Sequence, residues 1–135
     1  MNTRTWMTAA LLPAVAAPVV LALPPAVEQA FERYMAIPAA LLPVLEKVKD
    51  KATADAAAPQ LQGALAAVYD ARDALKDIKE LSEADAAEVK ARYEKRMREE
   101  WGRLYREIFR LQNNRCYDSE QFFKYFSYMT LMLEK

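Results

Sequence analysis

Few side chains of this sequence could carry out acid–base or nucleophilic chemistry near neutral pH. The chain of 135 residues contains no histidine, which is the side chain most often used for proton transfer at that pH and the commonest metal ligand. Catalytic triads, Cys–His pairs and histidine-based zinc sites are therefore excluded. The only cysteine, Cys116, cannot form a disulfide within the chain, although in an oxidising compartment it could link two chains.

The acidic side chains are numerous but form no recognisable site. No Glu-x-x-His motif is present, so the di-iron site of four-helix bundles lacks its histidines, and no acidic calcium-binding loop occurs. The two glycines, Gly63 and Gly102, belong to no phosphate-binding loop. We therefore expect no catalytic residue, no cofactor and no metal, and the sequence does not indicate an enzyme.

A basic stretch from Lys90 to Arg115 is interleaved with aromatic residues, as in some nucleic-acid-binding helices. Glutamates precede arginines by four residues in this stretch, an arrangement that stabilises exposed helices. The pairs are Glu88–Arg92, Glu94–Arg98 and Glu99–Arg103. The whole chain is also balanced at 19 Lys+Arg and 19 Asp+Glu. We expect a solvent-exposed helix face and no nucleic-acid partner.

Aromatic and methionine side chains gather near the C-terminus, where a helix from residue 119 onward is apolar on nearly every side. Such side chains are typical of adaptable binding surfaces. The candidate partner-binding residues are Trp101, Phe122, Phe126 and Met129. We favour the interpretation that the cluster closes the core of the protein over the helical hairpin. The alternative is that part of it faces a protein partner, a lipid surface or a second copy of the chain.

Helices must position all of these residues, because Ala, Leu, Glu, Lys and Arg dominate and no alternating β-branched run occurs. We expect an amphipathic helix over 25–37, which Pro38 and Pro43 break or restart. Asp50, Thr53 and Asp55 are candidate caps for a second helix, with a proline in its first turn.

That second helix carries a heptad-like seam of Leu61, Val68 and Leu75. Ser82 should cap a third helix, which runs to about Gln112 and ends at the two asparagines that follow. We expect the second and third helices to form a long antiparallel helical hairpin with flanking helices. The fold class is all-α, a three- to four-helix bundle after an N-terminal apolar leader.

The leader has the anatomy of a signal peptide, with no charged residue between Arg4 and Glu28 and an apolar run from Trp6 to Leu23. Cleavage after Ala22 is favoured over cleavage after Ala16. We expect residues 1–22 to be the signal peptide or an anchor and residues 23–135 to form a single helical domain. The alternatives are an uncleaved membrane anchor formed by residues 6–23, or an ordinary buried or disordered segment.

Two segments resemble a group of short, Ala-rich, exported bacterial helical proteins without assigned activity. They are LEKVKDKATADAAAPQLQGAL, at 45–65, and AEVKARYEKRMREEW, at 87–101. The resemblance implies export and an all-helical fold, and it carries over no site residues. We expect a periplasmic or secreted protein that acts by protein binding or self-association. A membrane-anchored structural protein of the envelope is the alternative.

Overall fold

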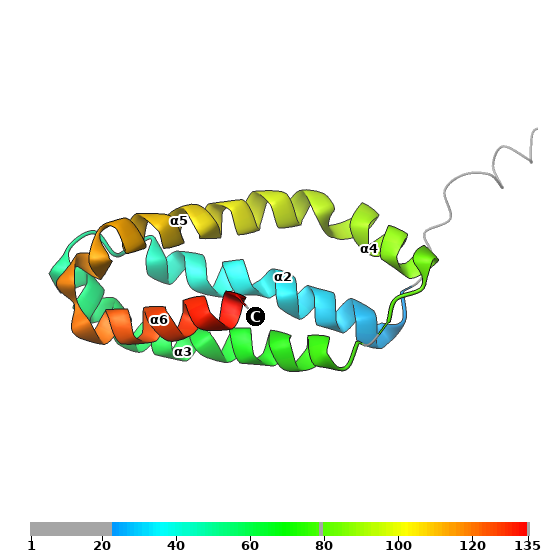
Figure 1. Cartoon of the computed structure of the whole chain (residues 1–135), viewed down its shortest axis with the longest axis horizontal. Helices are drawn as coiled ribbons and strands as arrows, with labels where there is room; N and C mark the ends of the chain where they lie inside the picture. The colour runs from blue at the N-terminus through cyan, green and yellow to red at the C-terminus, as the bar shows by residue number, and fades with distance from the viewer. Residues whose placement is uncertain (1–22, 79, 135) are drawn as a thin grey trace, which may run out of the picture.

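The protein is an antiparallel bundle of helices in a computed structural model that describes residues 23–78 and 80–134 (Figure 1). A π-helical turn joins α4 to α5, and a short 3₁₀ turn precedes α6. The elements are α2 (Pro25–Leu45), α3 (Lys51–Lys76), α4 (Glu83–Arg96), η1 (Met97–Trp101), α5 (Gly102–Asn113), η2 (Arg115–Asp118) and α6 (Glu120–Glu134). No strand occurs among these residues. The all-α bundle predicted from the sequence is confirmed, whereas the predicted leader lies outside the described residues.

The helices follow an up-and-down course (Figure 1). α2 and α3 pack closely side by side, α4, η1 and α5 continue one another, and α6 returns along α3. The close neighbours of α3 are thus α2 and α6. The long hairpin expected between the second and third helices is instead formed by α2 and α3, which make the most extensive helix–helix contact of the described chain.

α2 continues through both of its prolines, so the predicted break at Pro38 and Pro43 is wrong. A proline inside a helix leaves the carbonyl four residues earlier without its backbone donor. Burial offsets this cost, since Pro38 itself and neighbours such as Leu41 and Leu45 lie in the core. Tertiary packing here overrides the local preference of the chain.

Asp50 caps α3 through a reciprocal pair of hydrogen bonds with Thr53. The amide of Thr53 donates to Oδ1 of Asp50 at 2.8 Å, and the amide of Asp50 donates to Oγ1 of Thr53 at 3.0 Å. Of the three candidate caps, the chain therefore uses Asp50. Pro59 then falls in the helix interior rather than in the first turn as expected.

The third predicted helix is interrupted by the π turn η1. Ser82 caps α4 by accepting the amide of Asp85 at 3.1 Å, and α5 ends at Asn113, both as predicted. A π turn inserts an extra residue and rotates the following residues about the axis. Two of the three expected ion pairs form, but Arg103 instead reaches Glu46, directly after α2, at 2.8 Å.

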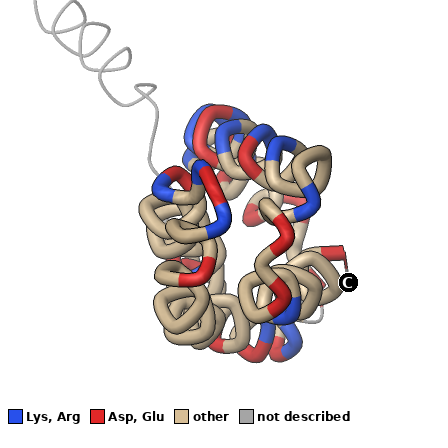
Figure 2. The backbone as a smooth tube through the Cα atoms, turned by 90° about the vertical axis from the view of Figure 1, so that its left-hand side faces the viewer, with Lys and Arg blue, Asp and Glu red and all other residues tan. Residues whose placement is uncertain are grey.

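Several polar and charged side chains of α4 contact α2. Arg92 lies 3.5 Å from Glu28, Arg96 lies 3.7 Å from Glu32, and the hydroxyl of Tyr93 donates to Glu32 at 2.8 Å. Figure 2 shows basic and acidic residues alternating along this upper helix, whereas long parts of the other helices carry neither. The face predicted to be fully solvated is therefore partly an interface with α2.

The link to α6 is a left-handed turn. Four consecutive non-glycine residues, Arg115 to Asp118, have φ between 52° and 62°. Ser119 follows and caps α6, because its hydroxyl accepts the amide of Phe122 at 3.3 Å and donates to Asp55 of α3. This pair of contacts holds the start of α6 against α3.

Candidate ligand cavity and exposed apolar face

The four residues predicted to bind a partner all lie in the interior. Trp101 is 5% exposed, Phe122 0%, Phe126 3% and Met129 0%. The rings of Phe122 and Phe126 stack with their centroids 6.1 Å apart. These side chains face the other helices of the bundle, so a partner could reach them only if the bundle opened; their role in binding stays a prediction.

Other apolar side chains of the same helices do meet the solvent. On α5 and α6 they are Tyr105, Phe109, Phe123, Tyr128 and Leu131, and we use the name outer apolar face for these five residues together. Their exposed fractions run from 43% for Tyr105 to 60% for Phe109. Sequence reasoning left these residues aside because a helix that is apolar all round does not reveal which side its neighbours cover.

A shallow groove of about 180 Å³ separates α5 from α6. It is lined by Tyr105, Ile108, Phe109 and Gln112 of α5 and by Thr130 and Leu133 of α6. Although α5 and α6 are consecutive, they do not pack closely against each other. This is the open side of the bundle.

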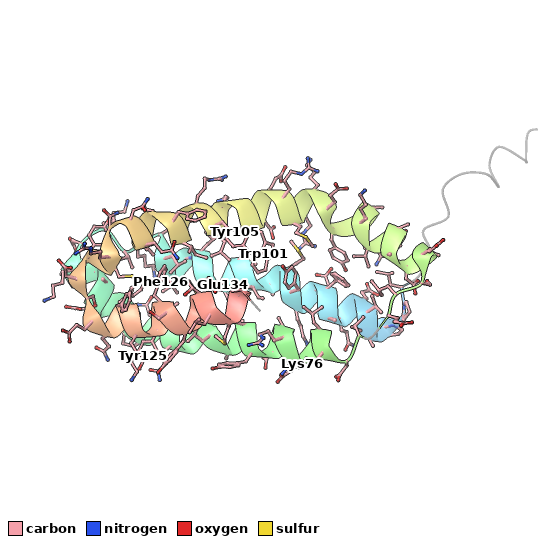
Figure 3. All side chains as sticks on the ribbon, in the orientation of Figure 1. Lys76, Trp101, Tyr105, Tyr125, Phe126 and Glu134 are labelled. Carbon is pink, nitrogen blue, oxygen red and sulfur yellow. The ribbon has the colours of Figure 1, made fainter. Side chains whose placement is uncertain are left out.

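A larger cavity of about 400 Å³ lies where α6 ends. The apolar part of its wall comes from α2, α3, η1 and α6. Besides Trp101 of η1, it includes Ile37, Val68, Leu75, Met132 and Leu133. Figure 3 shows Trp101 on the upper helix, Lys76 on the lower one and Glu134 at the end of α6. The cavity thus lies between the long helices, beside the end of the shorter one.

The polar lining of this cavity consists of hydrogen-bond donors. Arg72 and Lys76 come from α3, and Tyr34 comes from α2. Burial, with a smaller contribution from Tyr105, raises the pKa of Tyr34, so its hydroxyl keeps its proton at neutral pH. The ring of Tyr34 stacks on Trp101 with centroids 4.6 Å apart. Spacing along the chain does not indicate this group of residues, because its members lie on three separate helical segments.

Cys116 is 1% exposed, and burial raises the pKa of its thiol to about 11. A protonated, buried thiol reacts slowly with oxidants and with other thiols. A link between two chains through Cys116, considered from the sequence, would require the left-handed turn to open.

The described part of the chain holds neither a candidate metal site nor a helix that could span a membrane. No group of three or more Cys, Asp or Glu side chains there is placed to hold a metal ion, and no described helix is long and apolar enough to cross a membrane. Comparison with protein-family models, with curated proteins and with solved structures gives no match to this chain.

Proposed function

We propose that this chain is an exported helical protein that associates with a second copy of itself through the outer apolar face. One observation carries the proposal: five large apolar side chains are exposed on two consecutive helices whose core positions are already filled. Removing apolar surface from water contributes roughly 25 cal/mol per Å². Association with another molecule that buries this face would therefore be favourable, because the face is exposed to water in the single chain.

Charge favours a second copy as the occupant. Arg103 and Arg110 of α5 pair with Glu46 and Glu107, which leaves Arg106 as the cation of α5 without an ion pair among the described residues. α6 carries two glutamates and one lysine. In a two-fold dimer each surface meets its counterpart twice, so α5 of one copy can lie on α6 of the other with opposite net charge. The chain as a whole has a formal net charge of +0, so two copies do not repel each other at long range.

Sedimentation equilibrium of the purified chain tests self-association. We expect a dimer that Phe109→Ser converts to a monomer while the melting temperature, measured on dilute monomer, stays unchanged. Tyr69→Ser is the matched control, because Tyr69 is 55% exposed but lies on α3 and is not one of the five residues of the outer apolar face. A parent chain that stays monomeric at high concentration would overturn the proposal, as would equal effects of the two substitutions.

Export is proposed on the uncharged run from Trp6 to Leu23 and on the resemblance to exported proteins. Intact mass of the protein recovered from its native cell tests it, since removal of residues 1–22 lowers the mass by about 2 kDa. A full-length chain in the membrane fraction would favour the anchored envelope protein instead. A full-length chain in the cytoplasm would contradict both interpretations of the leader, as a signal peptide and as a membrane anchor.

A further inference from the structure

The cavity beside the end of α6 is a consequence of unequal helix lengths. α6 has 15 residues, whereas α3 has 26 and the continuous α4–η1–α5 helix runs from Glu83 to Asn113. α6 therefore stops while its neighbours continue (Figure 1). The volume of about 400 Å³ falls within the range of roughly 300–1,000 Å³ found for small-molecule sites.

The charged groups on the wall of this cavity are both cationic. Arg72 is half-buried, and no described residue forms an ion pair or hydrogen bond with its guanidinium. Lys76 has one carboxylate neighbour, Asp73, at 3.8 Å, but both side chains are largely exposed, at 68% and 78%. A pair with this distance and exposure contributes little. No acidic side chain is among the described residues that line the cavity.

One neutral donor adds to the cationic groups. The hydroxyl of Tyr34 has no hydrogen-bond partner among the described residues, whereas Nε1 of Trp101 is fully buried and so does not open into the cavity. The rest of the wall is mostly apolar. A site that combines positive charge and a hydroxyl donor with apolar walls matches a molecule with an anionic head and an apolar tail.

We propose that this cavity binds a free single-chain fatty acid, with the carboxylate between Arg72 and Lys76 and the tail against Ile37, Leu75 and Met132. The carboxylate accepts from the guanidinium and the ammonium, and the tail covers the aliphatic wall. None of the five residues of the outer apolar face lines the cavity, so this inference does not rest on self-association.

Fluorescence of Trp101 tests the proposal in the full chain carrying Trp6→Phe, which leaves Trp101 as the only tryptophan. Decanoate, added below its critical micelle concentration, should change the emission saturably. We expect decanol and decylamine to bind about tenfold more weakly or worse, because they lack the anionic head.

Paired variants locate the site. Arg72→Gln with Lys76→Gln should weaken decanoate binding about tenfold, and Leu75→Phe should weaken it by filling the cavity. Lys90→Gln with Lys95→Gln is the matched control, since it removes two exposed cations of α4 that line no part of the cavity, and it should leave binding unchanged. Thermal unfolding of each variant confirms that it is folded.

Three results would overturn the inference. The first is no saturable signal with decanoate. The second is equal binding of decanoate, decanol and decylamine, which would mean that the site does not distinguish the head groups. The third is an equal loss in the two double variants, which would mean that general charge, and not Arg72 and Lys76, attracts the acid. Repeating the titration in Phe109→Ser separates this site from the dimer, because ligand binding should persist there.

Discussion

Arg110 joins α5 to the end of α2. Its guanidinium donates to the carbonyl oxygens of Leu45 at 2.9 Å and Val48 at 2.7 Å, at the end of α2, and to Glu107 at 2.6 Å. A positive charge at a helix C-terminus is favourable, and hydrogen bonds to charged groups contribute about 1.5–3 kcal/mol. We expect Arg110→Met to lower the free energy of unfolding by about 2 kcal/mol, measured by urea denaturation.

Two controls separate charge from geometry in that experiment. Arg110→Lys keeps the charge but cannot reach both carbonyls with one planar group, so most of the loss should remain. Arg106→Met changes an exposed arginine of the same helix and should cost less than about 0.5 kcal/mol. Full stability of the lysine variant would show that the two-carbonyl geometry is unimportant.

The thiol of Cys116 makes a pH-dependent contribution to stability. Burial raises its pKa from 9.0 to about 11, so the folded chain holds this proton more tightly than the unfolded chain. The contribution is complete below pH 9 and is lost as the pH rises towards 11. We expect the free energy of unfolding to fall more steeply over this interval in the parent than in Cys116→Ala. Groups present in both proteins affect both equally, so the comparison isolates Cys116. Parallel curves of unfolding free energy against pH for the two proteins would contradict the assignment.

Residue-level expectations succeeded where the chemistry is local. The cap by Ser82 and the pairs of Glu88 with Arg92 and Glu94 with Arg98 depend only on spacing along one helix, and they form. The donors around the cavity depend on how distant segments meet. Nothing in the spacing of Tyr34 and Arg72 indicates that they line the same space.

At the scale of elements, the left-handed turn is the least expected feature. The asparagines at 113–114 predicted the end of α5, but the next four residues adopt positive φ without a glycine among them. Each non-glycine residue in this conformation costs about 1–2 kcal/mol, whereas glycine adopts it freely. The fold therefore accepts local strain to bring α6 back along α3.

Glycine at the exposed position 115 should relieve part of this strain. We expect Arg115→Gly to raise the free energy of unfolding by about 0.5–1 kcal/mol, net of the greater entropy of the unfolded chain. Arg106→Gly, in the helix α5, is the matched change and should lower it by about 1 kcal/mol. Thermal unfolding of both variants checks the expectation, and a loss of stability in Arg115→Gly would mean that the turn is unstrained.

Helix boundaries show the same division between local and distant causes. The cap of α3 was predictable because Asp50 and Thr53 satisfy each other's amides. The continuity of α2 was not, because it depends on the burial of Pro38, Leu41 and Leu45 against other helices. The π turn η1 was also not predicted, because an inserted residue leaves the apolar spacing of three or four residues nearly unchanged.

At the scale of the whole molecule, the apolar periodicity specified that each helix has a buried face but not which helix covers it. A bundle was therefore predictable, whereas the pairing of α3 with α2 and α6 was not. The same uncertainty governed α6, whose side chains are apolar in most directions. Only the packed structure separates Phe122 and Phe126, in the core, from Phe123 and Leu131, on the outside.

Two phenylalanines of α6 make that separation measurable. Phe126 is 3% exposed and Phe123 is 55% exposed, so the same truncation should act on different properties of the molecule. We expect Phe126→Ala to lower the free energy of unfolding by about 3–5 kcal/mol, as for buried aromatic residues, and Phe123→Ala to lower it by less than about 1 kcal/mol. Conversely, Phe123→Ala should weaken the dimer, which sedimentation measures on folded protein. If Phe126→Ala left stability intact and abolished association, Phe126 would be a partner contact as first predicted from the sequence, and α6 would have to turn its buried face outward to bind.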